Sequence, residues 1–249
     1  MLELPTLVSN LDQLLLVDRF RDYAPNGLQV EGRSQVTRLA TGVTACQALL
    51  EAAAAWSADA ILVHHGYFWR NEDPCIRGMK RRRLATLLSH DMSLLAYHLP
   101  LDAHATLGNN SQLAARLGLQ SEGRWGDQDI AMVGSLAEPM AAADFAAHIA
   151  SVLGRQPLHI QAGPVLVRHV AWSSGGAQGG IEAAAALGVD AYVSGEISEP
   201  TTHVARECGL HYFAAGHHAT ERFGVQAIGE YLASTYGLAH RFFDIDNPA

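Results

Sequence analysis

Cysteine is scarce in this sequence, and no two cysteines lie close together. The chain of 249 residues contains three, Cys46, Cys75 and Cys208, an odd number without a C-x-x-C pair. This pattern indicates neither a disulfide framework nor a zinc site built on cysteine thiolates. Because disulfides persist mainly in oxidising compartments, we expect a reducing environment and a cytoplasmic protein.

Positive charge and long apolar runs are also lacking. The sequence has 17 Lys and Arg against 25 Asp and Glu, a net charge of -8. This balance disfavours binding to nucleic acid or to an anionic membrane through bulk charge, and small-molecule partners are the better expectation. No apolar stretch reaches the roughly 18 residues of a membrane span, and the N-terminus has no basic region followed by an apolar run. We therefore expect no membrane partner and no targeting segment.

Short apolar stretches alternate with longer amphipathic ones, which predicts an α/β fold of two linked domains. We expect a metal-binding α/β domain in residues 1–125 plus 215–249 and a second α/β domain in residues 126–214. The polar, glycine-containing stretch 118–129 is the expected crossing between them. The expected helices are 6–22, 45–56, 77–90, 112–117, 141–153, 181–187, 199–208 and 216–232. The expected strands are 27–30, 37–43, 60–63, 93–97, 130–136, 157–161, 168–174, 191–194, 211–214 and 241–245.

Histidine is unusually frequent, with 13 in the chain, and six of them fall into three tight groups. The first group is His64-His65, which ends the apolar strand 60–63. Open parallel sheets bind ligands beyond the carboxyl ends of their strands, so the pair predicts a metal site as well as the plainer role of hydrogen-bonded structural residues. Successive strand side chains point to opposite faces, so both serve one site only if the chain turns at Gly66 or two ions share the site.

The second group follows strand 93–97, in the stretch His98-Leu-Pro-Leu-Asp102-Ala-His104. Two strands of one sheet thus end in His and Asp, which packing alone does not explain. The third group is His217-His218, at the start of a long helix. His217 and Glu221 are four residues apart and share one face of that helix, where they suit a single cation. A glutamate that complements the helix dipole also explains Glu221, but not the histidines.

Three weaker signals have both a functional and a structural interpretation. The turn Gly175-Gly176-Ala-Gln-Gly-Gly180 precedes a helix and predicts contact with an anion, although it lacks the spacing of a dinucleotide or P-loop motif. The basic cluster Arg77 to Arg83 is either a solvated helix face or a rim that attracts phosphate. Glu196, after strand 191–194, is either an exposed loop carboxylate, a partner that orients a metal ligand, or an acid-base group.

His64, His65, Asp102, His217 and Glu221 together supply three imidazoles and two carboxylates. Five ligands are too many for one catalytic zinc, but they suit two ions bridged by a carboxylate and a water molecule. Ligands of this type are compatible with Zn, Fe or Mn and do not choose among them. Two cations that share a water molecule lower its pKa, so hydrolysis is the natural reaction class. His98 and His104 are candidates for orienting ligands or transferring protons.

The motifs Val-His-His-Gly-Tyr-Phe-Trp, Tyr-His-Leu-Pro-Leu-Asp-Ala-His, Gly-Gly-Ala-Gln, Ser-Gly-Glu-Ile-Ser-Glu and Gly-His-His-Ala-Thr-Glu-Arg resemble those of the GTP cyclohydrolase 1 type 2 homologue family, also called domain of unknown function 34. The resemblance runs from about Asn26 to the C-terminus. It implies two linked α/β domains, a dinuclear metal site in the cleft between or beside them, and a toroidal homohexamer. It places the metal ligands at the five residues named above.

The resemblance also implies an activity, the opening of the guanine imidazole ring of GTP by metal-activated water. Glu196, His98 and His104 would then move protons, and Arg70, Gly175 and Gly176 would face the triphosphate. Two alternatives remain open. One is a metal-binding or metal-delivery protein without turnover, and the other is a metal-dependent phosphoesterase that acts on nucleotides or on single-stranded nucleic acid.

Overall fold

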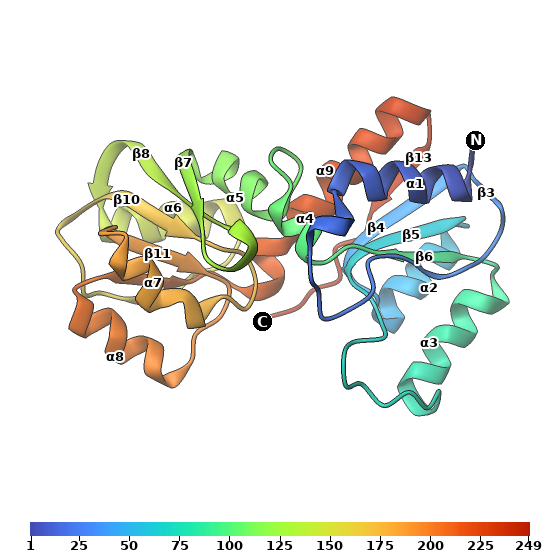
Figure 1. Cartoon of the computed structure of the whole chain (residues 1–249), viewed down its shortest axis with the longest axis horizontal. Coiled ribbons are helices and arrows are strands. Elements are labelled where there is room, and N and C mark those ends of the chain that lie inside the picture. The colour runs from blue at the N-terminus through green and yellow to red at the C-terminus, as the bar shows by residue number, and fades with distance from the viewer. The chain divides into compact units, whose positions relative to one another are not determined.

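The computed structural model describes all residues from Met1 to Ala249. The chain forms two compact units. The first contains Met1–Gly108 and Gly224–Asp246, and the second contains Asn109–Phe223 and Asn247–Ala249. Both are built from helices and strands, which confirms the predicted α/β class (Figure 1). The sequence-based domain boundaries stay a prediction.

The first unit is organised around a five-stranded sheet in the order β13-β4-β5-β6-β2. The strands are β13 (Ala239–Phe242), β4 (Arg38–Thr44), β5 (Ala60–His65), β6 (Ser93–Ala96) and β2 (Gly27–Val30). The first four are parallel, and β2 pairs with β6 in the antiparallel direction. The short strands β1 (Leu2–Glu3) and β3 (Gln35–Val36) form a separate antiparallel pair.

Helices cover both faces of this sheet. Helix α1 (Leu4–Leu15) and the C-terminal part of α9 (His217–Tyr236) pack on one face, where Leu62 of β5 is buried. Helices α2 (Gln47–Ala55) and α3 (Gly78–Ser89) pack on the other, where Ile61 is buried (Figure 1). Neighbouring side chains of β5 thus enter different cores, so this parallel strand is apolar on both sides.

Strand β5 ends at His65, and at the next residue, Gly66, the chain passes too close to its neighbours for a side chain. A Cβ at this position would overlap the side chains of Gln29 and Ala96. The next residue, Tyr67, is bound to the same Gln29 through its N–H (2.7 Å) and its carbonyl (3.1 Å). These contacts therefore hold the end of the strand that carries His64 and His65.

The second unit contains a six-stranded sheet in the order β7-β8-β10-β11-β12-β9. The strands are β7 (Leu119–Trp125), β8 (Ala131–Ala141), β10 (Leu166–Trp172), β11 (Ala191–Ser194), β12 (His211–Ala214) and β9 (Leu158–Ile160). Strands β10, β11 and β12 are parallel, and the others pair in the antiparallel direction.

Helices also cover both faces of the second sheet. One core contains apolar residues of α5 (Asn109–Leu117) and α6 (Ala142–Leu153) around Trp172 and Phe213. The other contains residues of α7 (Ile181–Ala186) and α8 (Glu199–Cys208) around Tyr192 and Tyr212. The carboxyl ends of β10 and β11 lead directly into the glycine turn and into Glu196, so the sheet positions both segments.

Several predicted segments need correction. Within residues 118–129, where the sequence predicts only a polar segment, Leu119–Trp125 forms β7, with a register shift between Ser121 and Gly123. The opening helix is Leu4–Leu15 rather than 6–22, because Leu16 adopts a left-handed conformation and ends it. Helix α5 begins at Asn109, and the last strand is Ala239–Phe242. None of the helices has the length and apolar character required to span a membrane.

Candidate metal centre

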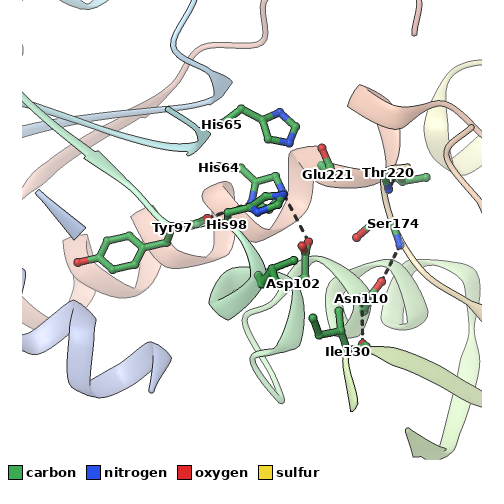
Figure 2. A network of polar contacts seen from close by, with 12 residues as sticks. His64, His65, Tyr97, His98, Asp102, Asn110, Ile130, Ser174, Thr220 and Glu221 are labelled. Carbon is green, nitrogen blue, oxygen red and sulfur yellow. Dashed lines mark hydrogen bonds and ion pairs between the residues drawn. The ribbon is translucent and has the colours of Figure 1, made fainter. Parts of the chain in front are cut away.

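His64 is held in one orientation at the end of β5. Its side chain is fully buried, and its Nδ1 lies 3.0 Å from the carbonyl oxygen of Tyr97 (Figure 2). A carbonyl only accepts hydrogen bonds, so Nδ1 of His64 must donate. In the neutral imidazole the lone pair is then on Nε2, the atom that a metal would bind.

His65 is oriented in the same way, by a hydroxyl. Its Nδ1 lies 3.2 Å from Oγ1 of Thr44, the last residue of β4. The centroids of the His64 and His65 rings are 4.5 Å apart. Although the two residues are neighbours at a strand end, both imidazoles therefore lie in one place, which resolves the problem of opposed strand faces.

Asp102 belongs to the short helix α4 (Leu99–Ala103), which follows β6 and starts with a proline in its first turn. Its Oδ1 lies 3.5 Å from Nε2 of His64, and the residue is buried (Figure 2). The ends of the adjacent parallel strands β5 and β6 thus bring His64, His65 and Asp102 together, and we call these three the first ligand set.

The second ligand set consists of His217 and Glu221, in the first turns of α9. Nε2 of His217 lies 3.1 Å from Oε2 of Glu221, and Glu221 is 3% exposed. The other imidazole nitrogen, Nδ1, lies 2.7 Å from Oε1 of Glu196. The predicted spacing of four residues therefore places the imidazole and the carboxylate on one helix face.

The electrostatics of the second set favour a positive charge. The hydrogen bond to Glu221 raises the pKa of His217 to about 9; burial opposes this increase, and the contact with Glu196 adds to it. Two carboxylates beside an imidazole favour its protonated form, because the positive charge of the ring is attracted to both. The same arrangement suits a metal ion, so the donor chemistry of this set fits a divalent cation.

The glycine turn packs directly against the second set. A Cβ on Gly175 would overlap a carboxylate oxygen of Glu221, and it would also lie 3.2 Å from Nε2 of His217. The N–H of Gly175 donates to Oγ1 of Thr220 at 3.0 Å. The turn predicted to contact an anion therefore lies beside candidate ligands and donates this N–H within the protein.

The remaining predicted residues have identifiable surroundings. The guanidinium of Arg70 donates to the carbonyl of Asp22 at 2.9 Å. Nδ1 of His104 accepts from the N–H groups of Thr106 (3.3 Å) and Leu107 (3.0 Å) in a local turn. A Cβ on Gly176 would lie 3.5 Å from the Glu196 carboxylate.

His98 and Asn110 are positioned by contacts that the sequence motifs do not show. Nδ1 of His98 lies 2.7 Å from a carboxylate oxygen of Asp22, far away in the sequence. The Asn110 side chain accepts from the N–H of Ser174 (2.8 Å) and donates to the carbonyl of Ile130 (3.0 Å) (Figure 2). Asp22 lies in a polar loop with no motif, and Asn110 resembles an ordinary helix cap.

Comparison with known proteins places these features in a family. A family model described as Duf34/NIF3 (NGG1p interacting factor 3) matches residues 2–248. A protein of Pseudomonas aeruginosa named GTP cyclohydrolase 1 type 2 homolog is 57% identical over 249 residues, covering 99% of this chain and 98% of that protein. A protein of Allochromatium vinosum with the same name is 55% identical over 250 residues, covering 100% and 98%.

Solved structures show the same fold. The protein ybgI is 50% identical with a TM-score of 0.97, and each chain covers 100% of the other. TTHA1606 from Thermus thermophilus is 35% identical with a TM-score of 0.91 over the full length of both chains. Reduced HcgD from Methanocaldococcus jannaschii, at 21% identity and a TM-score of 0.85 over 99% of this chain and 98% of that one, shows the fold alone.

Proposed function

The chain belongs to the Duf34/NIF3 family, and we propose that it is a metal-dependent hydrolase-like member that binds two divalent ions per subunit. The observation that carries the proposal is the chemistry of the two ligand sets. The first offers two imidazoles and a carboxylate, and the second offers an imidazole and a carboxylate. Nitrogen and oxygen donors without thiolates suit Zn, Fe or Mn.

All three imidazoles of the two sets are bound through Nδ1 to a second group. His64 donates to a carbonyl, His65 contacts a hydroxyl, and His217 contacts the Glu196 carboxylate. Metal-binding histidines usually have such a partner on the other ring nitrogen, which fixes the tautomer and the ring orientation. This pattern supports the assignment of these three residues as ligands.

The proposed reaction is hydrolytic attack on a nucleotide, with GTP as the first substrate to test because the curated relatives carry the name GTP cyclohydrolase 1 type 2 homolog. The metal ions would supply hydroxide from bound water near neutral pH. In this proposal Arg70, Gly175 and Gly176 face the phosphates. Glu196, His98 and His104 are the candidates for proton transfer. On the family resemblance we further propose a cytoplasmic homohexameric ring.

The metal is tested first. Purified protein is stripped with a chelator and titrated separately with Zn²⁺, Fe²⁺ and Mn²⁺, and the bound metal is measured by mass spectrometry. We expect two ions per chain. We also expect His64→Ala and Glu221→Ala each to lower this number, whereas His203→Ala, at an exposed position on α8, leaves it unchanged. A wild-type chain that retains no metal contradicts the proposal.

The reaction is tested on the metal-loaded protein with GTP, by measuring formate and a pterin-type product. Release of formate supports ring opening with loss of C8, and a pterin-type product additionally requires ring closure. The absence of both while metal remains bound removes the GTP cyclohydrolase reaction. A panel of nucleotides and phosphoesters then tests the phosphoesterase alternative.

The burial of the ligands favours a second candidate, a metal-binding or metal-delivery protein without turnover. His64 is 0% exposed and Glu221 is 3% exposed. Ligands so well shielded from water favour slow release of an ion. Tight retention of metal with no turnover on any substrate of the panel supports this candidate, and rapid metal exchange with pH-dependent turnover contradicts it.

A further inference from the structure

Asp22 has a carboxylate that is held by four hydrogen bonds. One oxygen accepts from Nδ1 of His98 (2.7 Å) and from the N–H of Tyr23 (2.6 Å). The other accepts from the N–H of Leu99 and from the side-chain amide of Asn26, both at 2.9 Å. The Asp22 side chain is 4% exposed. These four hydrogen bonds therefore hold the Asp22 carboxylate in one orientation.

His98 receives its orientation from this carboxylate. A carboxylate that accepts three other hydrogen bonds is ionised, so Nδ1 of His98 donates to it and the lone pair of the neutral ring is on Nε2. The backbone N–H of His98 donates to Oδ1 of Asn26 at 2.7 Å, and the rings of His98 and Trp69 form a T-shaped pair with centroids 5.0 Å apart. The ring is therefore held at the backbone, at Nδ1 and by the indole.

The ring that Asp22 holds lies among the histidines of the first ligand set. The ring centroid of His98 is 5.0 Å from that of His64 and 5.7 Å from that of His65. One nitrogen from each of the three imidazoles lies within 4.8 Å of the others. Because Nδ1 of each is bound to another group, Nε2 is the nitrogen that each presents.

We propose that His98 is a further metal-binding residue of the first ligand set, and that Asp22 is the positioning residue that directs its Nε2 to the metal. The inference rests on the proposed function, since it requires that the first set binds a metal ion. It assigns His98 to metal binding rather than proton transfer. In both His98 and His217, Nδ1 is then bound to a carboxylate, that of Asp22 and that of Glu196. Such a carboxylate orients the imidazole and makes it a stronger ligand.

The tautomer is measured by nitrogen-15 NMR of the imidazoles in chelator-treated protein at pH 8. The His98 signals are identified from their loss in His98→Gln. We expect Nδ1 of His98 to carry the proton and Nε2 to be unprotonated, and we expect Asp22→Asn to lower this preference. A proton on Nε2 of His98 in the wild-type protein overturns the proposal. This readout is independent of metal and of activity.

Metal affinity is measured by titration with Zn²⁺ against a competing chelator. Asp22→Asn should weaken binding by about 10- to 100-fold, the usual effect of losing the partner that orients a ligand. His98→Gln, which removes the proposed ligand itself, should weaken it at least as much. The control is Asp18→Asn, an exposed carboxylate in the same segment, which should leave the affinity unchanged. Unchanged affinity in both variants overturns the proposal while the proposed function stands.

Thermal unfolding separates binding from folding. If Asp22→Asn does not fold, His98→Gln decides the affinity test, because it leaves the carboxylate and its other three partners in place. If the wild-type chain binds no metal, the proposed function fails, and the NMR result still reports whether Asp22 fixes the His98 tautomer.

Discussion

Oε1 of Glu196 lies 2.7 Å from Nδ1 of His217, so an acidic side chain after β11 orients a candidate ligand at the start of α9. The other carboxylate oxygen of Glu196 accepts from the amide of Gln178 at 3.2 Å. The sequence left the role of Glu196 open between a solvent-exposed carboxylate, a partner of a metal ligand and an acid-base group. This contact favours the second of these roles, that of a partner which holds the imidazole of His217 in place.

Replacing Glu196 by Gln should therefore weaken metal binding. The amide cannot supply the negative charge that strengthens His217 as a ligand, so we expect a loss of about 10- to 100-fold in Zn²⁺ affinity with little change in thermal stability. Glu199→Gln is the matched control, because Glu199 is 82% exposed and contacts only a surface histidine in the same segment. Equal affinity in Glu196→Gln and wild type would show that the contact is not used in binding.

Replacing Gly175 by alanine should have two effects, backbone strain and a clash with the candidate ligand Glu221, and a second glycine separates them. Gly175 has φ +65°, and an added Cβ would overlap the Glu221 carboxylate. Gly188 has φ +71°, and its Cβ would meet nothing within 4 Å. Both Gly175→Ala and Gly188→Ala should cost about 1 kcal/mol of stability from the left-handed backbone. Only Gly175→Ala should also reduce metal binding.

Gly176→Ala is the neighbouring control for this prediction. Its Cβ would meet the Glu196 carboxylate at 3.5 Å, an ordinary van der Waals contact. Metal titration and thermal unfolding of the three alanine variants test the idea together. A Gly175→Ala protein that binds metal as wild type does would mean that Glu221 is free to move away or is not a ligand.

The sequence predicted those features that depend on neighbouring residues. His64 and His65 follow a run that is apolar on both sides, so the strand and its end were recognisable. His217 and Glu221 are separated by one helical turn, and the structure places their side chains 3.1 Å apart. Helical periodicity fixes the meeting of His217 and Glu221, whereas strand alternation predicts opposite faces for His64 and His65, whose ring centroids lie 4.5 Å apart.

Features that depend on long-range contacts could not be predicted. Asp22 meets His98 across 76 positions, and no spacing rule links a loop carboxylate to a residue after a later strand. Between its buried ends, Leu119 and Trp125, β7 contains only polar residues and glycine, so its composition predicts a polar segment rather than a strand. Its pairing with β8 comes from the tertiary fold rather than from its own composition.

Asn110 supports the strand end that leads to the glycine turn, and its replacement by alanine should destabilise the second unit. Its side chain binds the N–H of Ser174 and the carbonyl of Ile130, and the residue is 0% exposed. Alanine leaves both backbone groups without this partner, which should cost about 2 to 4 kcal/mol. Urea unfolding measures the loss.

The control for Asn110→Ala is Gln120→Ala, an exposed polar residue on β7 that should change the stability by less than about 0.5 kcal/mol. Because Ser174 precedes Gly175, Asn110→Ala should also weaken metal binding in the fraction that remains folded. A stability equal to that of wild type would mean that other groups replace both hydrogen bonds.

A pair of histidines far from the ligands in sequence predicts how stability depends on pH. Nε2 of His211 donates to the carbonyl of Pro164 at 2.8 Å, so its Nδ1 accepts from Nε2 of His159 at 3.1 Å. The His159 ring also stacks on Phe213, with centroids 4.3 Å apart. Burial lowers the pKa of His159 from 6.5, and the charge of His211 lowers it further.

The sign follows from proton uptake. Below pH 6.5 the unfolded chain binds a proton at His159 that the folded chain resists, so the folded state loses stability as the pH falls. Above pH 6.5 His159 is neutral in both states, and its full contribution is present. His159 therefore contributes less stability at pH 5 than at pH 7.5, whereas His217, with a pKa raised to about 9, contributes in the opposite direction in every variant and cancels when variants are compared by urea unfolding. His159→Phe keeps the stacking on Phe213 and should reduce this difference.

His203→Gln, which removes an exposed histidine of the same unit, should leave the difference between pH 5 and pH 7.5 as it is in wild type. His240 contributes a loss in the same direction in all three proteins, because burial lowers its pKa too, and the comparison between variants removes it. An equal loss of stability in His159→Phe and wild type would place the acid sensitivity elsewhere in the chain. A reduced loss would show that the second unit is stabilised by a histidine that must stay neutral to pack against Phe213.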